Sequence, residues 1–130
     1  MSGILLADSV MDRLRQRYPC YHETAYLFIL SGLHYTIERL GEPRHISGRE
    51  LAEGCRDLAL ERWGLMARAV LDYWGIRSTR DLGAIVFALV ECGVLVKQDD
   101  DSMEDFDGVY DFAQAFERDY SWNGVRRLKS

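Results

Sequence analysis

Two pairs of basic residues come nearest to a motif that could bind an anion or move a proton. Arg44 and His45 are adjacent in a predicted linker, and Arg77 and Arg80 lie on either side of a predicted helix start. A guanidinium donates several hydrogen bonds in a fixed geometry that suits phosphate or carboxylate, and a histidine exchanges protons near neutral pH. These residues therefore indicate either a contact surface or caps and ties between helices.

An enzyme would need a nucleophile, a metal or a cofactor, and the sequence gives little support for any of them. His45 acting with Arg44 or with Cys20 is one hypothesis, which predicts a pocket joining these groups in the folded chain. The chain has no GxSxG elbow and no phosphate-binding glycine loop, and Cys20 with His22 is only a fragment of a zinc site. We therefore expect no catalytic, cofactor-binding or metal-binding residues and interpret the chain as a non-enzyme.

An acidic segment follows the last long predicted helix. It begins with Asp99, Asp100 and Asp101, and residues 94–119 hold nine carboxylates and two basic residues. An EF-hand calcium loop starting at Asp99 would need an oxygen ligand where Met103 stands and a glycine where Glu104 stands. The calcium pattern therefore fails, and the segment suits a solvated loop or the docking of a basic partner, including this chain's own basic tail.

The charge balance disfavours nucleic acid as a partner. The formal net charge is −5 and the sequence pI is about 5.2, whereas binding to phosphates normally requires a basic stripe. The helix that would read DNA exposes Arg80 beside Asp81 and Glu91. A nucleic-acid-binding regulator that uses Arg77 and Arg80 is therefore the alternative interpretation, and it depends mainly on Arg80.

Helical periodicity governs most of the chain. Apolar spacing, N-cap residues and stop signals predict helices over about residues 8–17, 22–40, 47–62, 65–74, 78–93 and 113–120. Ser47 with Glu50 forms a capping box, Ser78 caps the fifth helix, and Gly75 ends the fourth in a left-handed conformation. The longest and most apolar helix, 22–40, should form the spine of the core.

The expected fold class is mainly α, with five to six helices. A helix-turn-helix in the C-terminal half would be followed by two short strands, Val94–Gln98 and Gly108–Phe112, which form a hairpin around the acidic loop in a winged-helix-like arrangement. Residues 1–120 would form one domain. Residues 121–130 would be a mobile basic tail in which Trp122 could anchor the tail or a partner.

The cellular compartment is expected to be the cytoplasm. No stretch approaches the roughly 20 apolar residues of a membrane span, and the first residues do not resemble a signal peptide. Cys20, Cys55 and Cys92 are odd in number and widely spaced, which favours reduced thiols over a disulfide framework.

Several segments together resemble an uncharacterised bacterial family. They are RHISGREL at 44–51, ALERWGLMA at 59–67, WGIRSTRDLGAIVF at 74–87, Asp105-Phe106 and Tyr110-Asp111-Phe112. The chain is similar here to the verrucomicrobial and planctomycete hypothetical repeat protein family, over roughly residues 18–117. The resemblance implies a bacterial protein of unknown function and carries no functional residues. It marks Arg44, His45, Arg77, Thr79 and Asp81 as a polar motif that hydrophobic patterning leaves unexplained.

The function that these observations favour is a protein–protein interaction module or a small homodimer. The acidic segment and a small-residue face on the fifth helix (Gly83, Ala84 and Ala88) support it. The candidate contact residues are Arg44, His45, Arg77, Arg80, Asp99, Asp100, Asp101 and Trp122. A nucleic-acid-binding regulator and an enzyme of unknown type remain the alternatives.

Overall fold

The computed structural model describes the backbone of residues 8–119 and the side chains of residues 8–116. The described chain is mainly helical. Its α-helices are α1 (Asp8–Arg17), α2 (Glu23–Arg39), α3 (Gly48–Trp63), α4 (Ala67–Tyr73) and α5 (Thr79–Glu91). The short helical turns are η2 (Gly64–Met66), η3 (Met103–Phe106) and the π-helical η4 (Gln114–Asp119). The expected positions of the five longer helices are confirmed to within about two residues at their ends.

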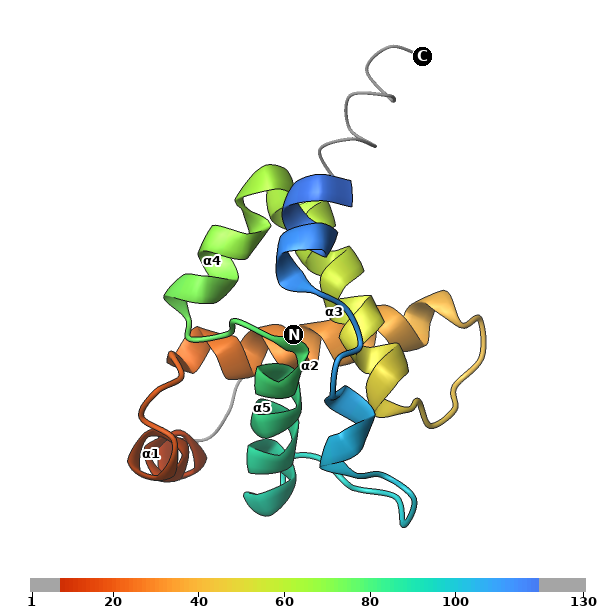
Figure 1. Cartoon of the computed structure of the whole chain (residues 1–130). Coiled ribbons are helices and arrows are strands. Elements are labelled where there is room, and N and C mark those ends of the chain that lie inside the picture. The colour runs from red at the N-terminus through yellow and green to blue at the C-terminus, as the bar shows by residue number, and fades with distance from the viewer. Residues whose placement is uncertain (1–7, 120–130) are drawn as a thin grey trace.

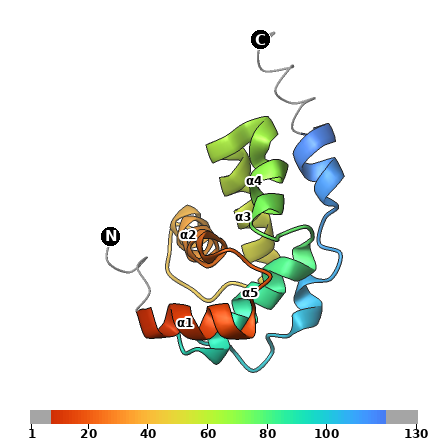
Figure 2. The same cartoon turned by 90° about the vertical axis from the view of Figure 1, so that its left-hand side faces the viewer.

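The helix α2 runs through the middle of the molecule (Figure 1). It contacts both α3 and α5, and the α3–α4 pair lies on the opposite side of α2 from α1 and α5 (Figures 1 and 2). The helix buries Tyr26, Phe28 and Ile29 almost completely. The expectation that this helix forms the core spine is therefore confirmed.

The crossing of α2 and α3 depends on two glycines. A Cβ atom at Gly32 would lie 2.4 Å from Cys55 Sγ, and one at Gly54 would lie 1.7 Å from Thr36 Oγ1. The Thr36 hydroxyl donates to the Gly32 carbonyl at 2.7 Å, so this buried polar group is satisfied within its own helix. Glycine at these two positions lets the backbones of α2 and α3 approach closely where the helices cross.

Local capping fixes where α3 and α5 begin. Ser47 accepts from the Glu50 amide while the Glu50 carboxylate accepts from the Ser47 amide, which is the expected capping box. Ser78 accepts from the Asp81 amide at the start of α5. Gly75 has φ +92°, and a Cβ there would lie 2.4 Å from the Cys20 carbonyl oxygen, so glycine is required at this turn.

Phe106 joins α3 to α5. Its ring lies 2.8 Å from the place a Cβ would take at Gly48, and its side chain lies 2.7 Å from the corresponding place at Gly83. Thr79 Oγ1 donates to the Phe106 carbonyl at 2.6 Å and accepts from the Val109 amide. The small-residue face expected on α5 is therefore not a free surface at Gly83, because Phe106 of the same chain covers it.

The expected β-hairpin is wrong for the part of the chain described here, since residues 8–119 contain no strand. Residues 94–102 form a loop. The chain after η3 lies alongside α3, where the Tyr110 hydroxyl donates to the Ala52 carbonyl at 2.8 Å. Phe112, which the expected hairpin would place in its second strand, is instead buried and packs against Phe116 of η4. Without a paired wing, the winged-helix description does not apply, and the fold is a helical domain.

No helix within residues 8–119 has both the length and the apolar character needed to cross a membrane. The expected basic tail, 121–130, lies outside the described residues.

Candidate functional site

An apolar pocket of about 230 Å³ opens between α2, the start of α3, α5 and the loop that follows α5. The helices α2 and α5 contribute Leu33, Ile37, Val86, Phe87 and Val90 to its wall. Ile46, Leu51, Leu95 and Phe106 contribute further apolar surface. We call this space the α2–α5 pocket.

Local interactions position the elements that surround the α2–α5 pocket. The capping box at Ser47 starts α3 at the pocket edge, and Phe106 keeps α3 and α5 together at its base. Val86 and Val90 stand four residues apart, so they share one face of α5. The pocket is therefore an unfilled space at the surface of the packed core.

A polar rim surrounds this apolar interior. His45 Nε2 lies 3.1 Å from Asp101 Oδ1, and this contact joins the α2–α3 linker to the acidic loop across the pocket edge. The other oxygen of Asp101 accepts from the Gln98 amide at 2.8 Å. Asp101 thus holds its own loop in a turn while it contacts the linker.

An ion pair fixes the linker on the α3 side. Arg44 donates from Nη1 and Nη2 to the two carboxylate oxygens of Glu50, at 3.2 and 2.7 Å. The hydrogen bond from Arg44 and that from the Ser47 amide lower the pKa of Glu50 to about 2. Arg44 and His45 therefore both organise the pocket rim from the linker.

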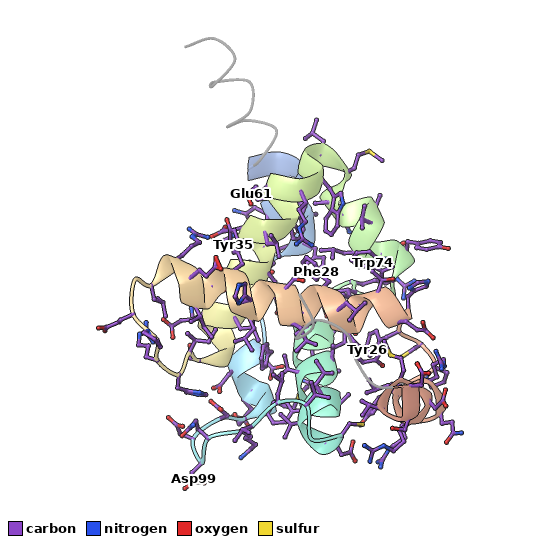
Figure 3. The ribbon with its side chains drawn as sticks, turned by 180° about the vertical axis from the view of Figure 1, so that it is seen from behind. Tyr26, Phe28, Tyr35, Glu61, Trp74 and Asp99 are labelled. Atoms are coloured by element: carbon purple, nitrogen blue, oxygen red, sulfur yellow. The ribbon has the colours of Figure 1, made fainter. Side chains whose placement is uncertain are left out.

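The loop beside the pocket combines exposed negative charge with exposed apolar surface. Asp99 and Asp100 are exposed, and Asp99 stands at the outer tip of the loop (Figure 3). Val96, which lines the α2–α5 pocket, has 85% of its surface exposed. Of the three sequence-predicted carboxylates in this loop, Asp101 contacts His45 and lines the pocket, and Asp99 and Asp100 directly precede it in the chain.

Arg77 and Arg80 belong to a different part of the surface. They line a polar recess of about 290 Å³ together with Arg68, Asp107 and Asp111, beside the start of α5. Arg80 Nη1 donates to Asp107 at 2.6 Å, and Arg77 Nε donates to Asp72 at 2.8 Å. Neither residue lines the α2–α5 pocket, so the structure separates the predicted contact residues into two groups.

The polar motif at residues 77–81 makes several ties between elements. Asp81 accepts from the Arg77 amide at 2.8 Å and from the Tyr21 hydroxyl at 2.7 Å. Burial and this hydrogen bond to a carboxylate raise the pKa of Tyr21. Thr79 also bonds to Phe106 of η3. The motif therefore connects the start of α5 both to Tyr21, between α1 and α2, and to η3.

The residues of the enzymatic hypothesis are only partly brought together. Arg44 and His45 share the α2–α5 pocket, whereas Cys20 is not among its lining residues and has its carbonyl against Gly75. Among the described residues, no group of three His, Cys, Asp or Glu side chains is placed to hold a metal ion.

Sequence reasoning missed the residues that build the pocket. Leu33, Ile37 and Val90 read simply as core positions, and the hairpin model placed Phe106 in a loop. The available signal was glycine inside or next to a helix, at Gly48 and Gly83, because such glycines often mark a close approach by another group.

Trp122 lies outside the described residues, so its predicted contact role stays a prediction. Comparison of the chain with family models, curated proteins and solved structures found no match. The resemblance to the verrucomicrobial and planctomycete family therefore also stays a prediction, and the function is argued from the geometry of the site alone.

Proposed function

We propose that this chain is a non-enzymatic protein-interaction module whose α2–α5 pocket receives a bulky apolar side chain from a partner. The partner segment carries arginine or lysine next to that side chain. The observation that carries the proposal is an unfilled apolar pocket directly beside an exposed acidic loop.

The size of the pocket supports a side chain as its occupant. Pockets for small-molecule ligands usually have volumes of roughly 300–1,000 Å³, and this one has about 230 Å³. A single tryptophan, phenylalanine or leucine fits a space of this scale. Buried anchors of this kind carry much of the binding energy in protein interfaces.

The charges beside the pocket support a basic partner. Asp99 and Asp100 are exposed next to the exposed Val96. A cationic partner segment lying over this loop would bring opposite charges together, which speeds association and disfavours acidic competitors. The pocket would supply affinity, and the loop would supply the choice of partner.

The alternatives receive less support from the contacts. Arg77 and Arg80 each donate to a carboxylate, which competes with phosphate for the same guanidinium groups. His45 contacts Asp101 at 3.1 Å, and Cys20, one of its two suggested partners, does not line the pocket. A nucleic-acid-binding regulator and an enzyme built on His45 are therefore weaker explanations.

We also propose a bacterial, cytoplasmic setting. The resemblance noted above implies a bacterial source, and Cys20, Cys55 and Cys92 are all free thiols. Free cysteines suit a reducing compartment.

Peptide display tests the proposed function. A library of random 12-residue peptides would be selected against the full chain. We expect enrichment of sequences with Trp, Phe or Leu next to Arg or Lys. Binding should be lost with Val90→Phe, which fills the pocket, and weakened with Asp99→Lys/Asp100→Lys.

Leu65→Ser is the matched control, since Leu65 is 60% exposed in η2 and does not line the pocket. Selected peptides that bind Val90→Phe as well as the unchanged chain would contradict the proposal. Failure to select any apolar–basic sequence would contradict it too.

A further inference from the structure

We propose that the α2–α5 pocket is filled by the C-terminal segment, residues 120–130, of a second copy of this chain, so that two copies exchange their segments. This inference rests on the proposed function, because it names the partner of the same pocket. Three observations carry it: the chemistry of the segment, the charge beside the pocket, and the point at which the described chain ends.

The C-terminal segment has the chemistry that the pocket requires. Its sequence is YSWNGVRRLKS, which contains Arg126, Arg127 and Lys129 and no acidic residue. Trp122 is a large apolar side chain of the anchoring kind. The same eleven residues therefore hold both halves of the predicted binding motif.

The surface beside the pocket is complementary to this segment in charge. Asp99 and Asp100 are exposed at the loop, and Glu104 of η3 is exposed close by in sequence. Lys97 is the one basic residue between Val94 and Asp119 whose side chain is described. Three cations from the segment would thus meet the exposed carboxylates of the loop, while Arg44, His45 and Lys97 line the pocket itself.

The position of η4 argues against insertion of Trp122 into the pocket of its own chain. The turn η4 contacts η2, α3 and α4, and η2 directly follows the C-terminal end of α3. The pocket instead lies at the N-terminal end of α3, where Ser47, Gly48 and Leu51 line it. Figure 1 shows η4 and the loop after α5 at opposite ends of the molecule, and Figure 3 shows the same separation between Glu61 and Asp99.

The chain between Asp119 and Trp122 is too short for Trp122 to cover that distance. The twelve-residue stretch from Leu51 to Trp63 spans about 18 Å at 1.5 Å per residue. Trp122 is three residues beyond Asp119, so it reaches at most about 11 Å. A second copy meets no such limit, and reciprocal exchange gives a closed two-fold dimer with two identical contacts.

A charge exchange tests this inference on the full chain. One variant is Asp99→Lys/Asp100→Lys, and the other is Arg126→Glu/Arg127→Glu. Each variant alone places like charges together, so its self-association should weaken at least about tenfold relative to the unchanged chain. An equimolar mixture of the two should form a heterodimer, because both exchanged contacts then pair opposite charges.

Sedimentation velocity over a concentration series measures these outcomes. Trp122→Ser should also weaken the dimer, and Leu65→Ser should leave it unchanged. A monomeric unchanged chain at all concentrations overturns the inference, as does a dimer that is insensitive to Trp122→Ser. A mixture that stays monomeric overturns it as well.

The failure of this inference differs from the failure of the proposed function. If the chain is monomeric but displayed peptides still need an open pocket at Val90, the exchange is wrong and the interaction module stands. If Val90→Phe changes neither dimer formation nor peptide binding, both are wrong.

Discussion

Arg44 stands beside His45 as if in a reactive pair, but its contacts with Glu50 give it a positioning role. Arg44 Nη1 and Nη2 donate to Glu50, and Nη1 also donates to the His45 carbonyl. Glu50 in turn holds the Ser47 amide at the start of α3. This small network fixes the linker that forms one edge of the α2–α5 pocket.

Replacing Glu50 with glutamine should change the acid stability of the chain. The pKa of Glu50 is lowered to about 2 from an ordinary value of 4.5, so its charged form stabilises the fold above about pH 4.5 and this contribution is lost as the pH falls towards 2. We expect Glu50→Gln to lower the free energy of unfolding at pH 7, with a difference that shrinks towards pH 2. Urea unfolding at a series of pH values measures it.

The matched control is Glu53→Gln, because Glu53 forms a longer 3.6 Å pair with an exposed Arg49. This variant should have little effect at any pH. A constant difference between Glu50→Gln and the unchanged chain from pH 7 to pH 2 would contradict the assigned role of the carboxylate.

The cysteines should differ sharply in reactivity. Burial raises the pKa of the Cys55 thiol to about 12, whereas Cys20 is exposed. Since the thiolate is the reactive form, Cys55 should resist alkylation at pH 8 in the folded chain, and Cys20 should react. Mass spectrometry of iodoacetamide-treated protein, with and without urea, measures this; rapid native labelling of Cys55 would contradict the buried α2–α3 crossing.

At the scale of elements, one aromatic residue connects parts of the chain that the sequence pattern treated separately. Phe106 lies against Gly48 of α3 and Gly83 of α5, and Thr79 bonds to its carbonyl. The turn η3 therefore closes the packing of two helices and forms part of the pocket wall.

Truncation of Phe106 should cost more stability than its position in a short turn suggests. Phe106 is 3% exposed, and Phe→Ala changes in cores typically cost about 3–5 kcal/mol. We expect a loss in this range for Phe106→Ala by urea unfolding. Met103→Ala in the same turn is the control, since Met103 is only half-buried. Equal losses from both variants would mean that η3 is not held by the Phe106 contact.

The helices were predictable from the sequence because their signals are local. Ser47 with Glu50 and Ser78 with Asp81 cap helices within four residues, and apolar spacing identifies the buried faces. The arrangement after α5 was not predictable in this way. The Tyr110 hydroxyl bonds to Ala52, and Phe106 packs on Gly48, across 58 residues in each case, so long-range packing overrode the alternation that suggested strands.

The candidate site was predictable only in part, for the same reason. Arg44 and His45 were identified as polar residues outside the hydrophobic pattern and Asp101 as part of the acidic segment, and the structure brings all three to one rim. The apolar interior between them was not visible, because Leu33, Ile37 and Val90 have the spacing of ordinary core residues. An unfilled space arises from how three helices meet, which no single segment encodes.

At the scale of the whole molecule, the apolar pocket and the exposed carboxylates lie together at one end. The opposite end carries η2, α4 and η4, from which the C-terminal segment continues. Arg77 and Arg80 line a different recess, beside the start of α5, and are not part of the proposed docking site.

Mapping a bound peptide on the full chain tests the central claim most directly. A display-selected peptide with one tryptophan and flanking arginines would be titrated into isotope-labelled protein, and backbone amide shifts would be recorded by NMR. The account predicts that the largest shifts lie at Val86, Val90 and Val96 and that Val90→Phe abolishes them. Shifts centred on Arg77 and Arg80, or on Leu65 and Met66, would contradict it.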